Sequence, residues 1–128
     1  MRYLLLVYDC LRHPEGGDAA DQRIAAVRAF IEMCAERGVL EAYDPLELED
    51  TATTVRVRDG EALFTDGPYA ETREHLGGYF VLNCDRDEAL ELAAKCPFAA
   101  EGGLELRPIM EVPGLGGSAE PGAYAGER

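Results

Sequence analysis

Residues 65–79 read TDGPYAETREHLGGY. The Asp-Gly-Pro at 66–68 predicts a turn, because Asp accepts backbone N–H bonds, Gly permits unusual φ and Pro fixes the next φ. The glycine pair at 77–78 leads into the apolar run 78–83, and glycine there lets another backbone or a ligand approach closely. The stretch therefore predicts a loop that is anchored at both ends and enters a buried strand.

Directly upstream, the sequence predicts a β-hairpin. Residues 53–58 alternate apolar and polar side chains with a period of two, which is typical of a half-exposed strand. Asp59-Gly60 is a strong signal for a two-residue hairpin turn. Residues 62–65 would then return antiparallel to the first strand.

The N-terminal part predicts a strand followed by a long helix. Residues 2–8 form an apolar run that suits a strand buried on both faces. A helix is expected over 19–37, with Asp18 as its N-cap and Gly38 ending it in the left-handed conformation. One apolar stripe along this helix comprises Ile24, Val27, Ile31 and Cys34, widened by Phe30 and Met33.

The remaining segments complete a second strand-helix-strand unit. An extended segment over 39–48 is interrupted at Pro45, and 78–83 reads as a second buried strand. The spacing of Asp85 to Glu88 resembles a capping box, and Pro97 should end the helix that it opens. A last strand is expected over residues 104–110.

This order predicts an α+β domain over residues 1–112 and a flexible C-terminal tail over 113–128. The fold expected is ferredoxin-like βαββαβ with a β-hairpin insert, in which both helices cover one face of an antiparallel sheet. A second copy is the simplest cover for the other face, so we expect a homodimer.

The composition narrows the classes of partner. The formal net charge of −13 repels phosphate backbones and anionic lipid, which argues against nucleic acid and membrane surfaces as partners. No export signal or transmembrane span is recognisable, so we expect a cytoplasmic protein with free thiols. The four cysteines form no C-x-x-C pair, and no phosphate loop or metal-ligand motif is present. We therefore expect neither a metal nor a cofactor.

The motif in 65–79 closely resembles the D-G-P-F-A-E-T-K-E-x-L-G-G-[FY] signature of the DGPF group of YCII-related proteins. The resemblance extends through residues 51–60, 87–90 and 104–109, and so covers most of the chain. It implies a dimeric α+β barrel in which two sheets pack face to face. It also implies an association with sigma-factor and transcription systems, which is not itself a demonstrated activity.

A departure from the wider superfamily bears on catalysis. The YciI-like branch is thought to use a His on the first helix and an Asp in a D-P-[FY] segment. The first predicted helix here has no His, and the matching segment is Cys96-Pro97-Phe98. Any catalysis would have to involve Asp66 and its neighbours.

Three titratable residues are the candidate catalytic groups. Asp66 is either a general base or a carboxylate that caps the turn. His75 is the natural proton carrier near neutral pH, and His75 or Arg73 would stabilise developing negative charge. Arg73 could instead form a surface ion pair with Glu71.

The candidate ligand-binding residues flank these groups. Tyr69 and Tyr79 would form the aromatic walls of a pocket, although Tyr69 could also simply cover the core. The other candidates are Glu71, Gly77 and Gly78.

Two functions remain open. In the first, the protein binds a small organic metabolite around the Asp-Gly-Pro turn, with cofactor-free isomerase- or lactonase-like proton transfer. In the second, it is a non-catalytic regulatory or protein-interaction module. A purely structural role of the motif as a dimer-forming loop is a third reading. The sequence does not decide whether the protein is an enzyme.

Overall fold

The computed structural model describes residues 1–8, 17–70 and 73–115 of the 128-residue chain. Its elements are, in chain order, β1 (Arg2–Tyr8), α1 (Asp18–Glu36), β2 (Leu40–Pro45), the 3-10 helix η1 (Glu49–Thr51), β3 (Thr53–Arg58), β4 (Glu61–Asp66), β5 (Leu76–Asn83), α2 (Arg86–Lys95), α3 (Phe98–Glu101) and β6 (Gly103–Pro108). The predicted tail lies outside the described residues from residue 116 onward.

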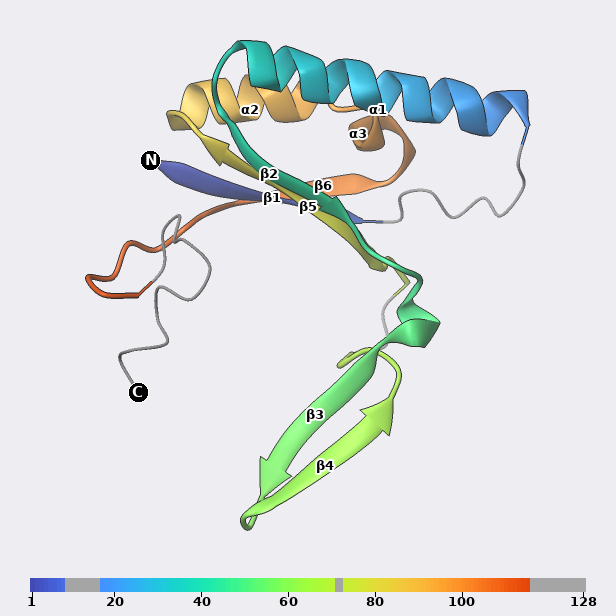
Figure 1. The fold of residues 1–128 in the computed structure, drawn as a ribbon, viewed down its shortest axis with the longest axis vertical. Helices are drawn as coiled ribbons and strands as arrows, with labels where there is room; N and C mark the ends of the chain where they lie inside the picture. Colours follow the sequence, from blue (N-terminus) through green and yellow to red (C-terminus); the bar gives the residue numbers. More distant parts are fainter. Residues whose placement is uncertain (9–16, 71–72, 116–128) are drawn as a thin grey trace.

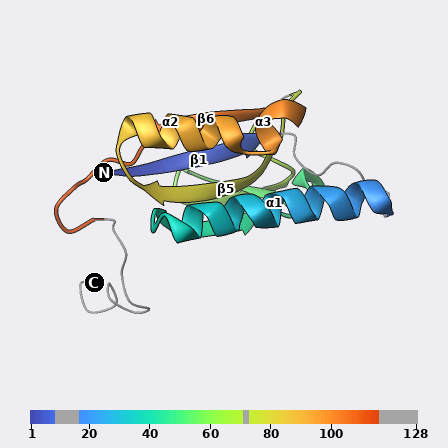
Figure 2. The same cartoon turned by 90° about the horizontal axis from the view of Figure 1, so that it is seen from above.

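The main sheet has four strands in the order β2-β5-β1-β6, and every neighbouring pair is antiparallel. Helices α1 and α2 lie side by side on one face of this sheet (Figures 1 and 2). β3 and β4 form a separate two-stranded sheet. The predicted α+β fold, with its ferredoxin-like strand order and hairpin insert, is confirmed at this level.

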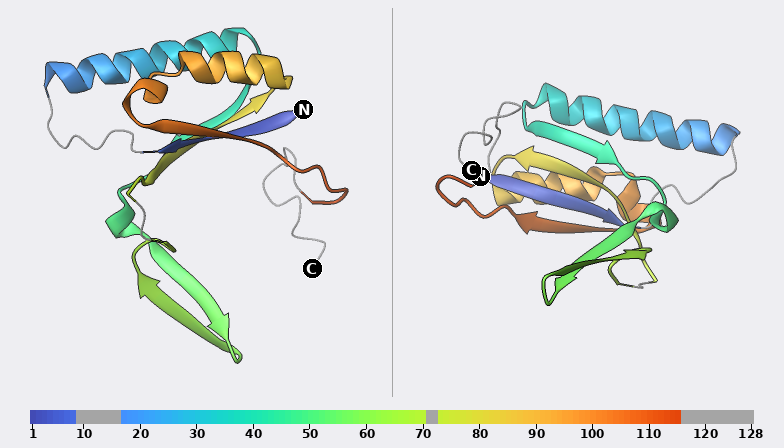
Figure 3. Two further views of the ribbon diagram at one scale, coloured as in Figure 1. Left: turned by 180° about the vertical axis from the view of Figure 1, so that it is seen from behind. Right: turned by 60° about the horizontal axis from the view of Figure 1, so that its bottom comes forward.

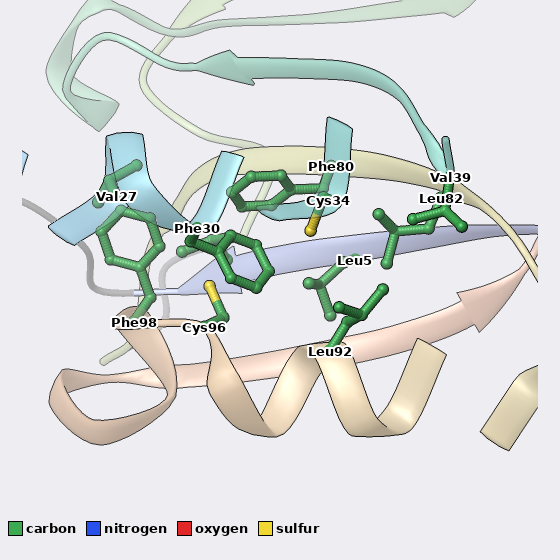
Figure 4. Close-up of a cluster of buried hydrophobic side chains, with 11 residues drawn as sticks. Leu5, Val27, Phe30, Cys34, Val39, Phe80, Leu82, Leu92, Cys96 and Phe98 are labelled. Carbon is green, nitrogen blue, oxygen red and sulfur yellow. The ribbon is translucent and has the colours of Figure 1, made fainter. Parts of the chain in front are cut away.

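The hydrophobic core lies between the helices and the sheet (Figure 4). Phe80 of β5 is at its centre, with its ring edge-on to Phe30 at 5.3 Å between centroids and stacked on Tyr43 at 4.3 Å. Aromatic rings favour both arrangements, which add to the effect of area burial alone. Cys34 is also fully buried here, and its burial raises the pKa of its thiol.

The expectation that β1 is buried on both faces is wrong for the described chain. Tyr3, Leu5 and Val7 face the helices and are buried, whereas the alternate residues are only half-buried. Helices α1 and α2 cover the same face, and no helix of the described residues lies over the other face. We call it the open face; it carries Leu4, Leu6, Tyr8, Tyr79 and Val81.

Helix α1 differs from the prediction at its start and along its stripe. Asp18 is the first helical residue and Gly17 is the N-cap, which has no side chain to accept a hydrogen bond. Ile24 is 51% exposed, because the N-terminal half of α1 extends past the end of the sheet (Figure 2). At the other end, Gly38 has a φ of 72°, as predicted.

Other boundaries shift by a few residues. β5 begins at Leu76, so the glycine pair lies inside the strand and not before it. β6 ends at Pro108, two residues earlier than expected. The short helix α3 was not predicted. The cap of α2 is as expected, since Asp85 accepts a 2.8 Å hydrogen bond from the backbone N–H of Glu88.

The β3–β4 hairpin projects from the body on the side of the sheet opposite the helices (Figures 1 and 3). Its turn has positive φ at Asp59 (52°) and Gly60 (78°), the signature of the expected two-residue turn. No helix in the described part of the chain is long and apolar enough to cross a membrane.

Candidate functional site

The Asp-Gly-Pro turn is fixed to the first strand of the hairpin. Gly67 has a φ of +107°, which favours glycine at this position. Its backbone N–H donates to the Ala52 carbonyl at 2.8 Å, and its own carbonyl accepts from Thr54 Oγ1 at 2.9 Å. Thr54 is the buried polar residue of this region. The motif loop therefore begins from a defined position beside Ala52.

The other end of the motif is held by the pairing of β2 with β5. Pro45 lies opposite Gly78, and the next backbone N–H, that of Leu46, donates to the Gly77 carbonyl at 2.9 Å. A Cβ on Gly78 would lie 3.1 Å from the Asp44 carbonyl oxygen. The close neighbour that Gly78 accommodates in the described chain is thus the backbone of β2.

This pairing brings the segment after β2 beside the motif loop, and a hollow of about 580 Å³ lies between them. We call it the motif hollow. Its lining comes from the end of β1, the segment around η1 and the motif, namely Tyr8, Leu46, Glu47, Leu48, Glu49, Thr51, Ala52, Pro68, Tyr69, Ala70, Glu74, His75 and Leu76. The volume falls within the range of pockets that hold small organic ligands.

Among the described residues, the titratable side chains that line the motif hollow are three glutamates, one histidine and two tyrosines. His75 Nδ1 lies 3.8 Å from Glu49 Oε1, and both side chains are about one quarter exposed, at 23% and 29%. Glu47 and Glu74 also line the hollow. The lining is therefore acidic, with a carboxylate close enough to orient the imidazole.

A second hollow of about 630 Å³ adjoins the first at the edge of the sheet. It is lined by Tyr8, Arg73, Glu74, Gly103, Leu104 and Glu105, so the two hollows share Tyr8 and Glu74. We call it the edge hollow. Arg73 supplies a cation there that the motif hollow lacks.

The structure separates the three predicted catalytic residues. His75 lines the motif hollow and Arg73 lines the edge hollow. Asp66 is exposed at the end of β4, opposite Thr53, and lines neither of these two hollows. The motif thus brings His75 and Arg73 to adjoining hollows, with Asp66 outside both.

The predicted ligand-binding residues also lie in different places. Tyr69 lines the motif hollow, is 73% exposed and has the Arg56 guanidinium over its ring at 4.7 Å. Gly77 and Gly78 belong to β5, while Glu71 lies outside the described residues. Tyr79 is on the open face.

The Tyr79 hydroxyl is engaged with a neighbouring strand. It donates a hydrogen bond of 2.6 Å to Asp44 Oδ2 on β2. That bond, followed by partial desolvation and the negative charge of Asp44, raises the pKa of Tyr79 above its ordinary value. Tyr79 therefore links β5 to β2 on the open face, and it does not line the motif hollow.

Sequence reasoning missed Tyr8 and Glu49 as lining residues. Both lie far from the motif along the chain, and they meet it only through strand pairing. Recognising that β2 pairs with β5 would have brought Glu49 into the neighbourhood of His75, because the antiparallel register continued past Pro45 places Leu48 opposite His75. Among the described residues, no group of three or more His, Cys, Asp or Glu side chains is placed to hold a metal ion.

Comparison with known proteins identifies the family to which this chain belongs. The model of the YCII-related domain matches residues 1–113. The chain belongs to the YCII-related domain family. An uncharacterised protein of Rhizobium meliloti (strain 1021) is 38% identical over 77 residues, which span 58% of this chain and 62% of that protein. The chain thus matches less than two thirds of this relative's length.

Proposed function

We propose that this YCII-related protein binds a small, uncharged organic molecule in the motif hollow. The observation that carries the proposal is that β1, the η1 segment and the signature motif contribute to one hollow of about 580 Å³. Leu46, Leu48 and Leu76 supply apolar lining, and Tyr8 and Tyr69 supply aromatic rings. Such a mixture of apolar walls with a few polar groups is typical of sites for small ligands.

The charge of the lining limits the class of ligand. Glu47, Glu49 and Glu74 surround the hollow and would repel a ligand carboxylate. Small lactones and phenols with a single ring are uncharged, and they can accept or donate a hydrogen bond at His75. We therefore expect these classes to bind more tightly than small carboxylates.

The proposal extends to cofactor-free proton transfer of the isomerase or lactonase type. His75 would carry the proton, since imidazole titrates nearest to neutral pH. Glu49 Oε1, at 3.8 Å from Nδ1, would orient the ring. Asp66 is the alternative base, and its exposed position makes it the natural comparison for His75.

Homodimer formation belongs to the same proposal. The open face carries Leu4, Leu6 and Val81 in its central strands, and no helix in the described part of the chain covers it. A second copy meeting this face with its own would bury both sets of side chains with two-fold symmetry.

The test is a thermal-shift screen of lactones, phenols, amines and small carboxylates against wild type, His75→Gln and Asp66→Asn. A ligand whose free concentration is a hundred times its Kd stabilises the folded state by about 2.7 kcal/mol, which gives a readily measured rise in Tm. We expect a lactone or phenol to raise the Tm of wild type and Asp66→Asn, and to raise that of His75→Gln less.

The controls separate binding from turnover. A ligand that stabilises wild type is then incubated with it and followed by NMR for conversion, with His75→Gln as the inactive comparison. Binding without conversion would support a sensor and remove the catalytic extension. Equal stabilisation of wild type and His75→Gln, or a preference for carboxylates, would contradict the assignment to the motif hollow.

A further inference from the structure

The motif hollow and the edge hollow meet at Tyr8, the last residue of β1. Tyr8 pairs with Leu76 of β5 on one side and with Gly103 of β6 on the other. Residues directly opposite each other in an antiparallel pair share a face, so all three positions belong to the open face. Leu76 lines the motif hollow, Gly103 lines the edge hollow, and Tyr8 lines both. Tyr8 is therefore a wall that the two hollows share.

The motif crosses the same boundary. Arg73 lines the edge hollow, Glu74 lines both hollows, and His75 lines the motif hollow. The Cα atoms of residues two apart lie at most about 7 Å from each other, so one small molecule can reach both Arg73 and His75. A ligand held at His75 can therefore extend past Glu74 into the edge hollow.

The sheet is irregular at this boundary. Val7 pairs with Gly78 whereas Tyr8 pairs with Leu76, so β5 has one extra residue, Gly77, across from β1. Such a β-bulge bends its strand and re-aims the side chains beside it, and bulges are over-represented next to active sites. The bulge thus ends the regular sheet where the two hollows meet.

The edge hollow has open space over Gly103. In the described chain, a Cβ built on Gly103 would meet no atom within 4 Å apart from its chain neighbours. Gly103 is not among the glycines with positive φ, so its backbone does not require glycine. A glycine inside a strand can mark a position where a ligand approaches closely. The space beside Tyr8 is therefore open to a ligand.

Arg73 gives the edge hollow its hydrogen-bond donors. In the part of the chain that the structure describes, no hydrogen bond or ion pair engages its guanidinium, which has five N–H donors. Glu74 and Glu105 also line this hollow, and Glu105 is paired with Arg107. A ligand carboxylate would meet the charge of Glu74 beside Arg73, whereas a neutral carbonyl oxygen accepts from Arg73 without that repulsion.

We propose that the edge hollow is a subsite for a neutral, carbonyl-bearing arm of the ligand whose ring occupies the motif hollow. The inference rests on the proposed function, which supplies the ring site. Arg73 donates to the carbonyl oxygen of an amide or ester, and Tyr8 packs where ring and arm join. Neighbouring strands lie about 4.8 Å apart, so Leu76 and Gly103 are separated by about 10 Å, which a single ring with a short acyl arm can span. The ligand class thus narrows to uncharged rings that carry such an arm.

The test compares each ring alone with the same ring bearing the arm, by NMR titration of isotope-labelled protein. The probe pairs are phenol with para-hydroxyphenylacetamide, and γ-butyrolactone with its α-acetamido derivative. Gly103→Val fills the edge hollow with a side chain that suits a strand, and Arg73→Gln removes the guanidinium. Arg28→Gln, on α1 and lining neither of these two hollows, is the matched control. Circular dichroism verifies the fold of each variant.

We expect the arm to raise the affinity of wild type roughly threefold to tenfold over the ring alone, as one added hydrogen bond gives. Gly103→Val and Arg73→Gln should each remove most of that gain and leave the Kd of the ring alone unchanged. Arg28→Gln should alter neither value. If Gly103→Val does not fold, Arg73→Gln decides the question, because Arg73 is exposed and its replacement leaves the core intact.

Three outcomes would overturn the inference alone. Equal affinity of wild type for both members of each pair would reject the subsite while ring binding stands. A gain that persists in both Gly103→Val and Arg73→Gln would place the arm elsewhere. Tighter binding of para-hydroxyphenylacetate than of the amide would reject a neutral arm. If none of the probes binds wild type, the proposed function fails as well.

Discussion

The guanidinium carbon of Arg56 lies 4.7 Å from the centroid of the Tyr69 ring and joins the hairpin to the motif loop. Tyr69 lines the motif hollow, so the position of the hairpin and the shape of the hollow depend on each other. The hydrogen bonds from Thr54 to Gly67 and from Gly67 to Ala52 also link these two parts.

Replacing Arg56 with Ala is therefore expected to release the Tyr69 ring. An exposed cation–π contact contributes about 0.5–1 kcal/mol, so the free energy of unfolding should fall by no more than that. The Tyr69 ring protons should shift in NMR spectra towards random-coil values. Arg58→Ala is the matched control, because Arg58 donates to the carbonyl of its own neighbour Val57. Unchanged Tyr69 resonances in Arg56→Ala would contradict the contact.

Gly78→Ala should destabilise the sheet through a backbone clash. The added Cβ would lie 3.1 Å from the Asp44 carbonyl oxygen and 3.4 Å from Pro45 Cα. Overpacking of this kind costs about 1–3 kcal/mol, to be measured by urea denaturation. Gly103→Ala, in β6, meets nothing within 4 Å and should be neutral or slightly stabilising. If the two variants had similar free energies of unfolding, the backbone of β2 would have moved away from the added Cβ without loss of stability.

Asp85 and Asp18 offer a comparison of two helix starts. Asp85 accepts from the Glu88 N–H, whereas Asp18 lies inside α1 and makes no cap bond. Asp85→Ala should lower the unfolding free energy by about 1 kcal/mol, and Asp85→Ser should restore most of it. Asp18→Ala removes only a favourable charge near the helix N-terminus and should cost less. A larger loss at Asp18 in thermal denaturation would refute this ranking.

The hydrogen bond from Tyr79 to Asp44 predicts that the stability of the folded state depends on pH in the alkaline range. The folded-state pKa of Tyr79 is raised above its ordinary value of 10.0, chiefly by that bond. Its contribution to stability is therefore complete below the unfolded pKa and is lost as the pH rises through the folded pKa. Tyrosinate absorbance should include one late-titrating group that is missing in Tyr79→Phe.

Asp44→Asn provides the control for this assignment, because the amide can still accept the hydrogen bond but carries no charge. The pKa of Tyr79 should then move back towards its ordinary value. A late-titrating group that persists in Tyr79→Phe would have to be assigned to another tyrosine.

The parts of the fold that the sequence predicted well depend on local signals. Asp59-Gly60, Gly38 and Asp85 each act through the conformation or hydrogen bonds of a few adjacent residues, and each is found as expected. Ile24 illustrates the opposite case. Its helical spacing matches the buried stripe, but spacing along a helix does not report how far the sheet beneath it extends.

The site was predictable only in part for the same reason. The motif located His75 and Tyr69 at a hollow, since a conspicuous run of glycine, proline and titratable residues identifies a specialised loop. Glu49 and Tyr8 reach the hollow through strand pairings between distant segments. Those pairings depend on register, and hydrophobic alternation fixes only the face on which a residue lies, since a shift of two residues leaves that face unchanged.

The order of strands in the sheet also bears on how the chain acquires its structure. β1 lies between β5 and β6, and β2 lies at an edge beside β5, so each ladder of the four-stranded sheet joins segments far apart along the chain. The β3–β4 ladder is the local pairing. High contact order of this kind slows folding, and β1 and β2 have no sheet partner on the ribosome until β5 has emerged. The hairpin can close first, and the sheet should then assemble late and in a single cooperative step.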